Sequence, residues 1–125
     1  MSRPTHRTYH HLGFEILVGR GARENDHLTF REARPDDLWL HAAGYAGSHV
    51  VIRRPDRDTV VPPEVVEVAA RLAAWHSKAR EAGGKVEVHL CRAGDVRKRP
   101  GAPAGEVLLG SWTRVKVYSR NPFPD

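Results

Sequence analysis

The sequence comprises 125 residues, of which 40% are hydrophobic and 28% are charged, with a net charge of +5. This length and composition are typical of one globular domain and exclude a chain that is disordered throughout. The lone Cys91 excludes an internal disulfide and a cysteine-based zinc cage, and no run approaches the roughly 18 apolar residues of a membrane span. The basic N-terminus lacks the apolar segment of a signal peptide. We therefore expect one soluble, cytoplasmic domain over residues 1–125, with a core at about 8–120 and short flexible termini.

The first half of the chain predicts three strand regions and one helix. Apolar and polar residues alternate in the strand regions, whereas the helix has modest amphipathicity. The predicted elements are strands over 8–20 around a turn at Leu12-Gly13, a helix over 22–32, and strands over 38–42 and 49–53.

The clearest helix of the sequence begins at Pro62-Pro63. Proline suits the first helical turn, where its missing N–H group is not required. Apolar residues then recur at helical spacing from Val65 to Ala79, and we expect Gly83-Gly84 to end the helix.

The last third predicts strands again and carries most of the excess charge. Residues 85–91 alternate as a strand, 100–105 form a loop, and 106–109 with 112–118 are predicted to form a hairpin around Gly110-Ser111. The resulting order predicts an α+β domain, in which a mixed or antiparallel sheet combines with two main helices. The densest basic run, Arg97-Lys98-Arg99, favours a polyanionic partner, chiefly nucleic acid.

The two central strands predict their own register. If they pair antiparallel with His41 opposite His49, then Trp39 faces Val51 and Asp37 faces Arg53, all on one side of the hairpin. The other side is then wholly aliphatic, with Leu38, Leu40, Val50 and Ile52. A slip by one residue would move the charged residues to the core side, so we expect this register.

The polar side of this hairpin is open to several interpretations. Two histidines and an aspartate can bind a metal or perform acid–base chemistry, with Ser48 as a nucleophile. Alternatively, Gly47 and the residues after it present backbone N–H groups to an anion such as phosphate. In the structural alternative, backbone carbonyls satisfy both histidines. A third metal ligand is not obvious, with His76 and His89 as the candidates, and no catalytic signature is present, so we expect neither a metal nor a cofactor.

Several ordered blocks of the sequence resemble one known family, the NFACT RNA-binding domain (NFACT-R). The blocks are 13–20 (GFEILVGR), 24–29 (ENDHLT), 33–41 (ARPDDLWLH), 47–52 (GSHVVI), 69–70 (AA) with 77–80 (SKAR), and 96–105 (VRKRPGAPAG). Together they cover nearly the whole chain and are far more specific than any one motif. The resemblance implies a role in translation, because the long NFACT proteins act in ribosome-associated quality control and engage tRNA and the large ribosomal subunit. The N-terminal region and coiled coil of those proteins have no counterpart in 125 residues, so only RNA binding is carried over.

The hypothesis from the sequence is therefore a non-enzymatic RNA-binding module for tRNA or another structured or ribosomal RNA, with the ribosome as a further partner and no membrane partner. The expected RNA contacts are Arg20, His41, Tyr45, Ser48, His49, Lys78, Arg97, Lys98 and Arg99. The expected organising residues are Asn25, Asp37, Trp39, Gly47, Arg53 and Ser77. Two alternatives remain: an enzyme that acts on RNA through Asp37, His41 and His49, and a docking module for a ribosomal or RNA-modifying protein.

Overall fold

The computed structural model describes residues 6–124, so residues 1–5 and 125, the outermost parts of the termini expected to be flexible, lie outside the described residues, as does most of the basic N-terminus that lacks the features of a signal peptide. The strands are β1 (His6–His11), β2 (Phe14–Gly19), β3 (Leu38–Ala42), β4 (Val50–Ile52), β5 (Lys85–Arg92), β6 (Val96–Arg97), β7 (Leu108–Leu109) and β8 (Thr113–Tyr118). The helices are α1 (Ala22–His27) with its π-helical continuation η1 (Leu28–Glu32), α2 (Pro63–Trp75), and the short 3-10 turn η2 (Ala93–Asp95). Within residues 6–124, no helix has the length and apolar character that crossing a bilayer requires.

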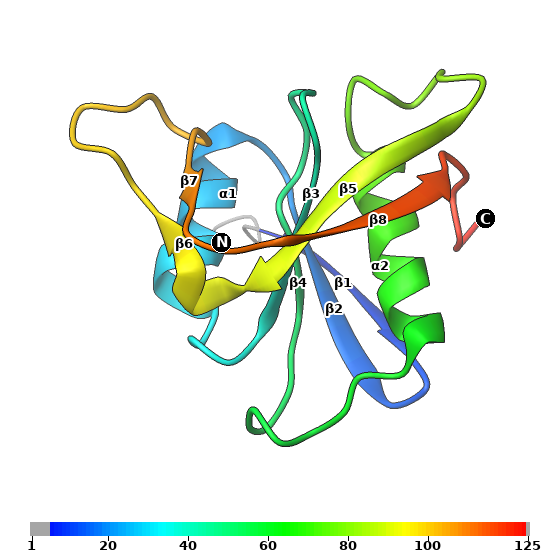
Figure 1. Cartoon of the computed structure of the whole chain (residues 1–125), viewed down its shortest axis with the longest axis horizontal. Coiled ribbons are helices and arrows are strands. Elements are labelled where there is room, and N and C mark those ends of the chain that lie inside the picture. The colour runs from blue at the N-terminus through cyan, green and yellow to red at the C-terminus, as the bar shows by residue number, and fades with distance from the viewer. Residues whose placement is uncertain (1–5, 125) are drawn as a thin grey trace, which may run out of the picture.

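Six strands form one sheet in the order β1-β2-β4-β3-β5-β8, and each neighbouring pair is antiparallel. Helices α1 and α2 lie on opposite sides of this sheet, and β6 with β7 forms a small second sheet on the α1 side (Figure 1). The predicted α+β class with two main helices is therefore confirmed, and the sheet is antiparallel.

The first two strands form the predicted hairpin. Its two turn residues, Leu12 and Gly13, have positive φ angles of 49° and 82°. Positive φ at both central residues is the type I′ geometry, which matches the twist of the flanking strands. The hairpin pairs His11 with Phe14 directly across the turn.

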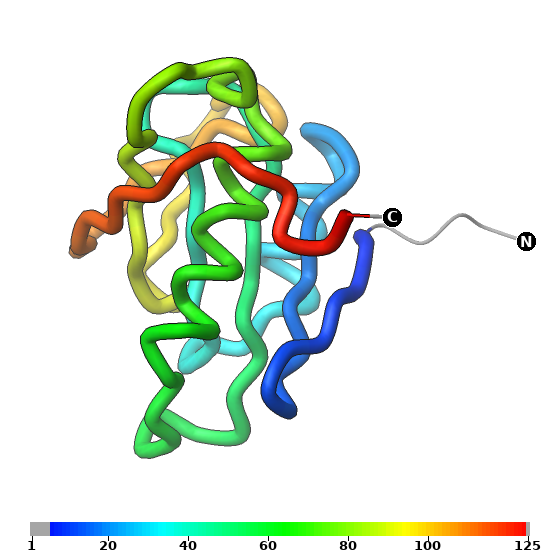
Figure 2. Tube along the Cα trace, turned by 90° about the vertical axis from the view of Figure 1, so that its right-hand side faces the viewer, coloured from blue at the N-terminus to red at the C-terminus, as the bar shows by residue number. Residues whose placement is uncertain are grey.

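Helix α2 covers one side of the sheet with the predicted apolar stripe. Val65, Ala69 and Leu72 are fully buried against aliphatic residues of the central strands, among them Leu40 and Val50. Figure 2 shows α2 lying along the sheet, with the C-terminal tail crossing near its end toward β1. There the ring of Phe123 stacks on Tyr9, with 4.9 Å between the centroids.

The predicted end of this helix is wrong. Helix α2 ends at Trp75 instead of continuing to Gly83-Gly84. Ser77 forms an isolated antiparallel bridge with Gly47, and the carbonyl of His76 accepts a hydrogen bond of 2.9 Å from the Ser48 N–H. These backbone groups pair with the β3–β4 loop, so they are not available to another helical turn.

The predicted C-terminal hairpin is also wrong. Strand β7 pairs with β6, and β8 pairs with β5 at the edge of the main sheet. The turn at Gly110-Ser111 therefore carries the chain from one sheet to the other, and the Gly110 N–H donates to the carbonyl of Asp95. A local turn signal was correct here, but the strands on its two sides have distant partners.

Candidate nucleic-acid interface

The central hairpin has the register predicted from the sequence. Strand β3 pairs with β4 so that Trp39 lies opposite Val51, with Leu38 opposite Ile52. The same register brings the rings of His41 and His49 to 5.6 Å between centroids. At the other end of the hairpin, Arg53 Nη1 lies 3.5 Å from the carboxylate of Asp37.

The side of the hairpin expected to be polar is a second, mixed core under α1 and η1. Trp39 and Val51 are buried there together with Leu17, Leu28 and Cys91. The buried polar side chains of the described residues belong to this side or border it: Asn25, Thr29, Asp37 and His49. Because water is excluded, each of them requires a partner inside the protein.

A chain of hydrogen bonds satisfies the buried His49. The Trp39 indole Nε1 donates to Thr29 Oγ1 at 3.0 Å, and Thr29 Oγ1 lies 2.7 Å from His49 Nδ1. His49 Nε2 lies 3.1 Å from the carbonyl oxygen of Gly105, which only accepts. The proton of His49 is therefore on Nε2, and Nδ1 accepts from Thr29. Burial and the neighbouring His41 lower the pKa of His49 to about 4, so the ring is neutral near pH 7.

Asp37 lies at the opposite end of the hairpin from His41 and His49, where it is bonded to other groups. Asp37 accepts hydrogen bonds from the backbone N–H groups of Arg34 and Arg54, at 2.9 and 3.0 Å, and it pairs with Arg53. It thereby fixes the turn before β3, while both ring nitrogens of His49 are already bonded. Within residues 6–124, no group of three His, Cys, Asp or Glu side chains is placed to hold a metal ion.

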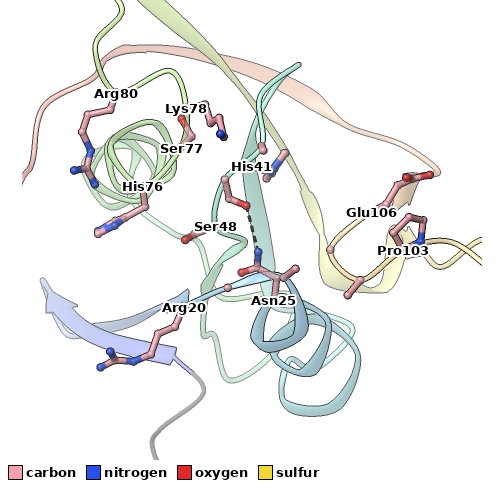
Figure 3. A pocket seen from close by; sticks show the side chains of 16 residues that line it. Arg20, Asn25, His41, Ser48, His76, Ser77, Lys78, Arg80, Pro103 and Glu106 are labelled. Atoms are coloured by element: carbon pink, nitrogen blue, oxygen red, sulfur yellow. Dashed lines mark hydrogen bonds between the residues drawn. The ribbon is translucent and has the colours of Figure 1, made fainter.

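Beside this core lies a hollow of about 650 Å³. Four segments that are distant in sequence form its walls: the β2–α1 turn with α1, the β3–β4 region, the segment after α2, and the β6–β7 loop (Figure 3). Its lining side chains include Arg20, Asn25, His41, Ser48, His76, Ser77, Lys78, Arg80 and Glu106. The hollow thus unites seven of the residues predicted from the sequence as RNA contacts or organisers, including Gly47.

Asn25 joins α1 to the β3–β4 loop. Its Nδ2 donates to the carbonyl of Gly47 at 3.2 Å, and its Oδ1 accepts from the backbone N–H of His49 at 3.0 Å. Gly47 itself must be glycine, because a Cβ there would lie 2.5 Å from the Cβ of Ser77. Ser48 Oγ donates to the carbonyl of Gly19 at 2.7 Å and ties the same loop to β2. The predicted organising roles of Asn25 and Gly47 fit these contacts.

Ser77 forms local hydrogen bonds at the end of α2. Its Oγ donates to the carbonyl of Ala74 at 2.7 Å and accepts from the N–H of Ala79 at 3.0 Å. The hydroxyl thus takes up backbone groups at the point where the chain leaves the helix. Ser77 therefore fixes the wall of the hollow from which Lys78 and Arg80 project.

Positive charge surrounds the hollow. Arg20 and Lys78 are exposed, and among residues 6–124 their side chains have no hydrogen-bond or ion-pair partner. The guanidinium of Arg80 lies 4.5 Å from the centroid of the Trp75 ring. The carboxylate of Glu106 is held by Arg99 at 2.9 Å, so the acidic residue of the lining is already paired. The charge available to a ligand in this hollow is therefore positive.

Two histidines at the hollow are neutral near pH 7. Burial and the nearby His89 lower the pKa of His41. Burial, with repulsion from Arg7 and Arg80, lowers the pKa of His76 to about 4. Neutral imidazoles can both donate and accept hydrogen bonds, which suits contacts to ribose hydroxyls or base edges.

The basic run predicted to contact RNA is divided by the structure. The ammonium group of Lys98 lies 3.0 Å from a carboxylate oxygen of Asp26 and donates to the carbonyls of Pro103 and Glu106. Lys98 therefore holds the β6–β7 loop against α1. Arg99 is paired with Glu106, whereas Arg97 is exposed without a partner among residues 6–124.

A further predicted residue lies outside the hollow, and three features that were not predicted as part of the site belong to its lining. Tyr45 is 45% exposed at the β3–β4 loop, as expected for a stacking residue, but it does not line the hollow. The sequence analysis did not assign His76, Arg80 or the loop around Gly105 to the site. Arg80 belongs to the SKAR block, which was the available signal, whereas the contact of Gly105 with His49 joins residues 56 apart.

Comparison with known proteins finds relatives of this chain. A family model described as the NFACT protein RNA binding domain matches residues 5–111. The Rqc2 homolog RqcH of Bacillus subtilis (strain 168) is 41% identical over 107 residues, which cover 84% of this chain and 18% of that protein. The ribosome quality control complex subunit NEMF homolog of Drosophila melanogaster is 30% identical over 93 residues, 74% of this chain and 9% of that protein.

A solved structure shares the fold. The C-terminal part of the fibronectin/fibrinogen-binding protein from Streptococcus suis aligns with a TM-score of 0.83 and 35% identity, and the alignment covers 94% of this chain and 46% of that one. This chain thus spans only a fraction of the length of its relatives. The extent of the family match nevertheless confirms the resemblance seen in the sequence: the chain belongs to the NFACT RNA-binding domain family.

Proposed function

We propose that this chain binds structured RNA, either tRNA or ribosomal RNA, in the hollow between α1, the β3–β4 loop and the segment after α2. The observation that carries the proposal is a pair of cations, Arg20 and Lys78, which lie on different walls of the hollow and have no hydrogen-bond or ion-pair partner among residues 6–124 (Figure 3). Phosphate groups are the ligands such cations bind in RNA, and these contacts position the RNA rather than read its sequence.

The remaining groups at the hollow suit an RNA ligand. His41, His76 and Ser48 offer neutral hydrogen-bonding groups beside the cations, as recognition of ribose 2′-hydroxyls requires. Tyr45 is proposed to stack on an unpaired base at the rim, and Arg97 to add an outer phosphate contact. His49, Asn25 and Lys98 act by holding the walls in place.

The names of the relatives support a proposal about where in the cell this chain acts. RqcH is named as a homolog of Rqc2, and the Drosophila relative is named as a subunit of the ribosome quality control complex. We propose that this chain also acts at the ribosome in the cytoplasm. Because the match covers 18% of RqcH, no further activity of that protein is carried over to this chain.

An equilibrium binding experiment tests the proposal. Labelled tRNA, a folded ribosomal RNA fragment and duplex DNA of equal charge are titrated with the purified chain in 0.15 M salt. The double variant Arg20→Ala/Lys78→Ala is compared with Arg31→Ala/Arg57→Ala, which removes two exposed arginines outside the hollow.

The proposal predicts that a structured RNA binds more tightly than duplex DNA. The hollow variant should then lose about tenfold in RNA affinity, whereas the control variant should stay within about twofold. Equal, weak binding of all three nucleic acids, reduced alike by both double variants, would indicate a generic basic surface and contradict the proposal.

A further inference from the structure

A second surface with nucleic-acid chemistry lies on β5 and β8, at the edge of the main sheet. The register places Lys85 opposite Tyr118, Glu87 opposite Lys116, and His89 opposite Arg114. Because side chains alternate along a strand, these six point to one side, while the residues between them, such as Val86 and Val117, are buried toward α2. We call this side, together with Trp112 and Arg120, the outer β5–β8 face.

Two large aromatic side chains are exposed on this face. Trp112 is 45% exposed and Tyr118 is 49% exposed. Six residues of extended chain separate them, which corresponds to about 20 Å. The centroid of the Trp112 ring lies 5.5 Å from that of the His89 ring, and this contact helps to hold the indole against the sheet. Exposed aromatic rings provide surfaces on which unpaired bases can stack.

Cations lie beside Tyr118 and along β8. Lys85 Nζ and Arg120 Cζ each lie 5.6 Å from the centroid of the Tyr118 ring. Lys116 is exposed without a partner among residues 6–124. The one acidic residue of the face, Glu87, is already engaged by His89 at 3.5 Å and by Arg114 at 3.6 Å. The face therefore combines a net positive charge with two stacking platforms.

The outer β5–β8 face adjoins the hollow. In the β3–β5 pairing, His89 lies directly opposite His41, which lines the hollow. A polymer bound in the hollow can therefore continue across His41 and His89 toward Trp112 and Tyr118. The aromatic and basic residues of β8 and its flanks follow residue 111, where the match to the family model ends.

We propose that the outer β5–β8 face binds a single-stranded segment of RNA, with bases stacked on Trp112 and Tyr118 and phosphates bound by Lys85 and Lys116. Stacking requires unpaired bases, because a duplex presents phosphates and grooves to a flat sheet and hides its base faces. The choice of RNA as the polymer rests on the function proposed for the hollow. The outer face adds a single-stranded site to that function.

The test uses a labelled 12-nucleotide RNA of repeating CA, which has no secondary structure, alongside tRNA. The variant Trp112→Ala/Tyr118→Ala removes both platforms, and Trp112→Phe/Tyr118→Phe keeps aromatic rings at both positions. Phe30→Ala removes an aromatic side chain that is also exposed, at 38%, but lies on η1. Circular dichroism and tRNA binding confirm that each variant is folded.

The proposal predicts that the alanine variant binds the 12-mer at least about 20-fold more weakly, whereas the phenylalanine and Phe30 variants stay within about threefold. RNA should quench tryptophan fluorescence in the native chain and quench it much less in the phenylalanine variant, because Trp112 is the stacked indole.

Three results would overturn the proposal. The first is an alanine variant that binds the 12-mer with an affinity within twofold of the native chain. If this variant also still binds tRNA, the hollow remains a site and only the outer face is excluded. The second is equal binding of the 12-mer and of polyglutamate of the same charge, which indicates an acidic protein partner. The third is self-association through this face that the alanine variant abolishes. If the native chain binds tRNA but not the 12-mer, this proposal alone is contradicted; if it binds neither, the function proposed for the hollow is contradicted as well.

Discussion

The two sides of the central sheet are built from different chemistry. On the α2 side, the buried residues form a continuous apolar cluster in which Leu40, Val50 and Leu72 meet without a buried polar partner. On the α1 side, Trp39 and Val51 share a smaller cluster with hydrogen-bonded polar groups such as Thr29 and His49. The same two strands supply residues to both sides, because their side chains alternate.

This difference separates stability from positioning. Apolar burial is non-directional, so the α2 side stabilises the sheet without specifying where a loop lies. Hydrogen bonds are directional, and on the α1 side they join the core to the loops that form the hollow. Asn25 bonds to the carbonyl of Gly47, and His49 bonds to the carbonyl of Gly105. Changes on the α2 side should therefore alter stability alone, and changes on the α1 side should alter stability and RNA binding together.

The largest expected effect is on the α2 side. Leu72→Ala removes a fully buried side chain, and we expect the free energy of unfolding to fall by about 2–5 kcal/mol. Chemical denaturation measures this loss. The folded fraction should keep its tRNA affinity within about twofold, because the Leu72 side chain lies in the apolar cluster under the sheet and does not line the hollow. The control Leu12→Ala, at a turn residue that is 58% exposed, should change stability by less than about 0.5 kcal/mol. Weaker tRNA binding by the fully folded Leu72→Ala variant would contradict the claim that the α2 side affects stability alone.

The second effect is a pH dependence that belongs to the α1 side. The pKa of His49 is about 4 in the folded chain, against about 6.5 for an unperturbed histidine, so the unfolded state binds more protons between these values. The free energy of unfolding should therefore be highest above about pH 6.5 and fall toward pH 4, by about 3 kcal/mol for this residue.

Denaturation at several pH values measures that slope, and His49→Gln separates the contribution of His49 from that of other groups. Since the pKa values of His41 and His76 are also lowered, the variant should retain the part of the slope that these two residues contribute. An unchanged slope in His49→Gln would show that His49 is not held neutral by the Thr29–His49–Gly105 arrangement.

A smaller effect is expected at Asn25. Asn25→Ala leaves the buried N–H of His49 and the carbonyl of Gly47 without their partner, which should cost about 1–3 kcal/mol of stability. Because the β3–β4 loop loses its tie to α1, tRNA affinity should fall as well. Asn121→Ala is the matched control, since Asn121 accepts a hydrogen bond only near the C-terminus. If both variants change tRNA affinity equally, Asn25 does not position the β3–β4 loop for RNA binding.

The smallest effect distinguishes a positioning lysine from a phosphate contact. Lys98→Met keeps the aliphatic stem but removes the ammonium group that joins Asp26 to the β6–β7 loop, at a cost of about 1 kcal/mol or less. We expect weaker tRNA binding with an unchanged dependence on salt, measured by fluorescence anisotropy. A shallower salt dependence would instead identify Lys98 as a phosphate contact, as the sequence alone indicated.

The sequence predicts most of the α2 side and little of the α1 side. Aliphatic alternation and the Asp37–Arg53 pairing were sufficient to predict the register of β3 and β4, and helical spacing predicted the stripe of α2. The stripe also misled: Ala79 is buried as predicted, but it lies beyond the helix, in the segment that pairs with the β3–β4 loop. An apolar residue that must be buried can reach the core from a helix or from an irregular segment, so burial alone does not specify the backbone conformation.

The candidate site was predicted in part for a similar reason. Arg20, Lys78, His41 and Ser48 were recognised by residue type and by family blocks, and the fold brings them to one hollow. The bonds from Thr29 to His49 and from Lys98 to the β6–β7 loop were not predicted, because each joins residues from separate elements. A basic residue in a loop has the same sequence signature whether it binds RNA or the protein's own carbonyls.

The most direct test of the central claim is the salt dependence of tRNA binding. The logarithm of the association constant is measured against the logarithm of salt concentration for the native chain, Arg20→Ala/Lys78→Ala and Arg31→Ala/Arg57→Ala. If the hollow binds phosphates through two cations, the slope of the hollow variant becomes shallower by about 1.4–1.8, and that of the control does not change. Equal slopes for all three proteins, or an equal reduction in both variants, would contradict the assignment of the hollow as the RNA site.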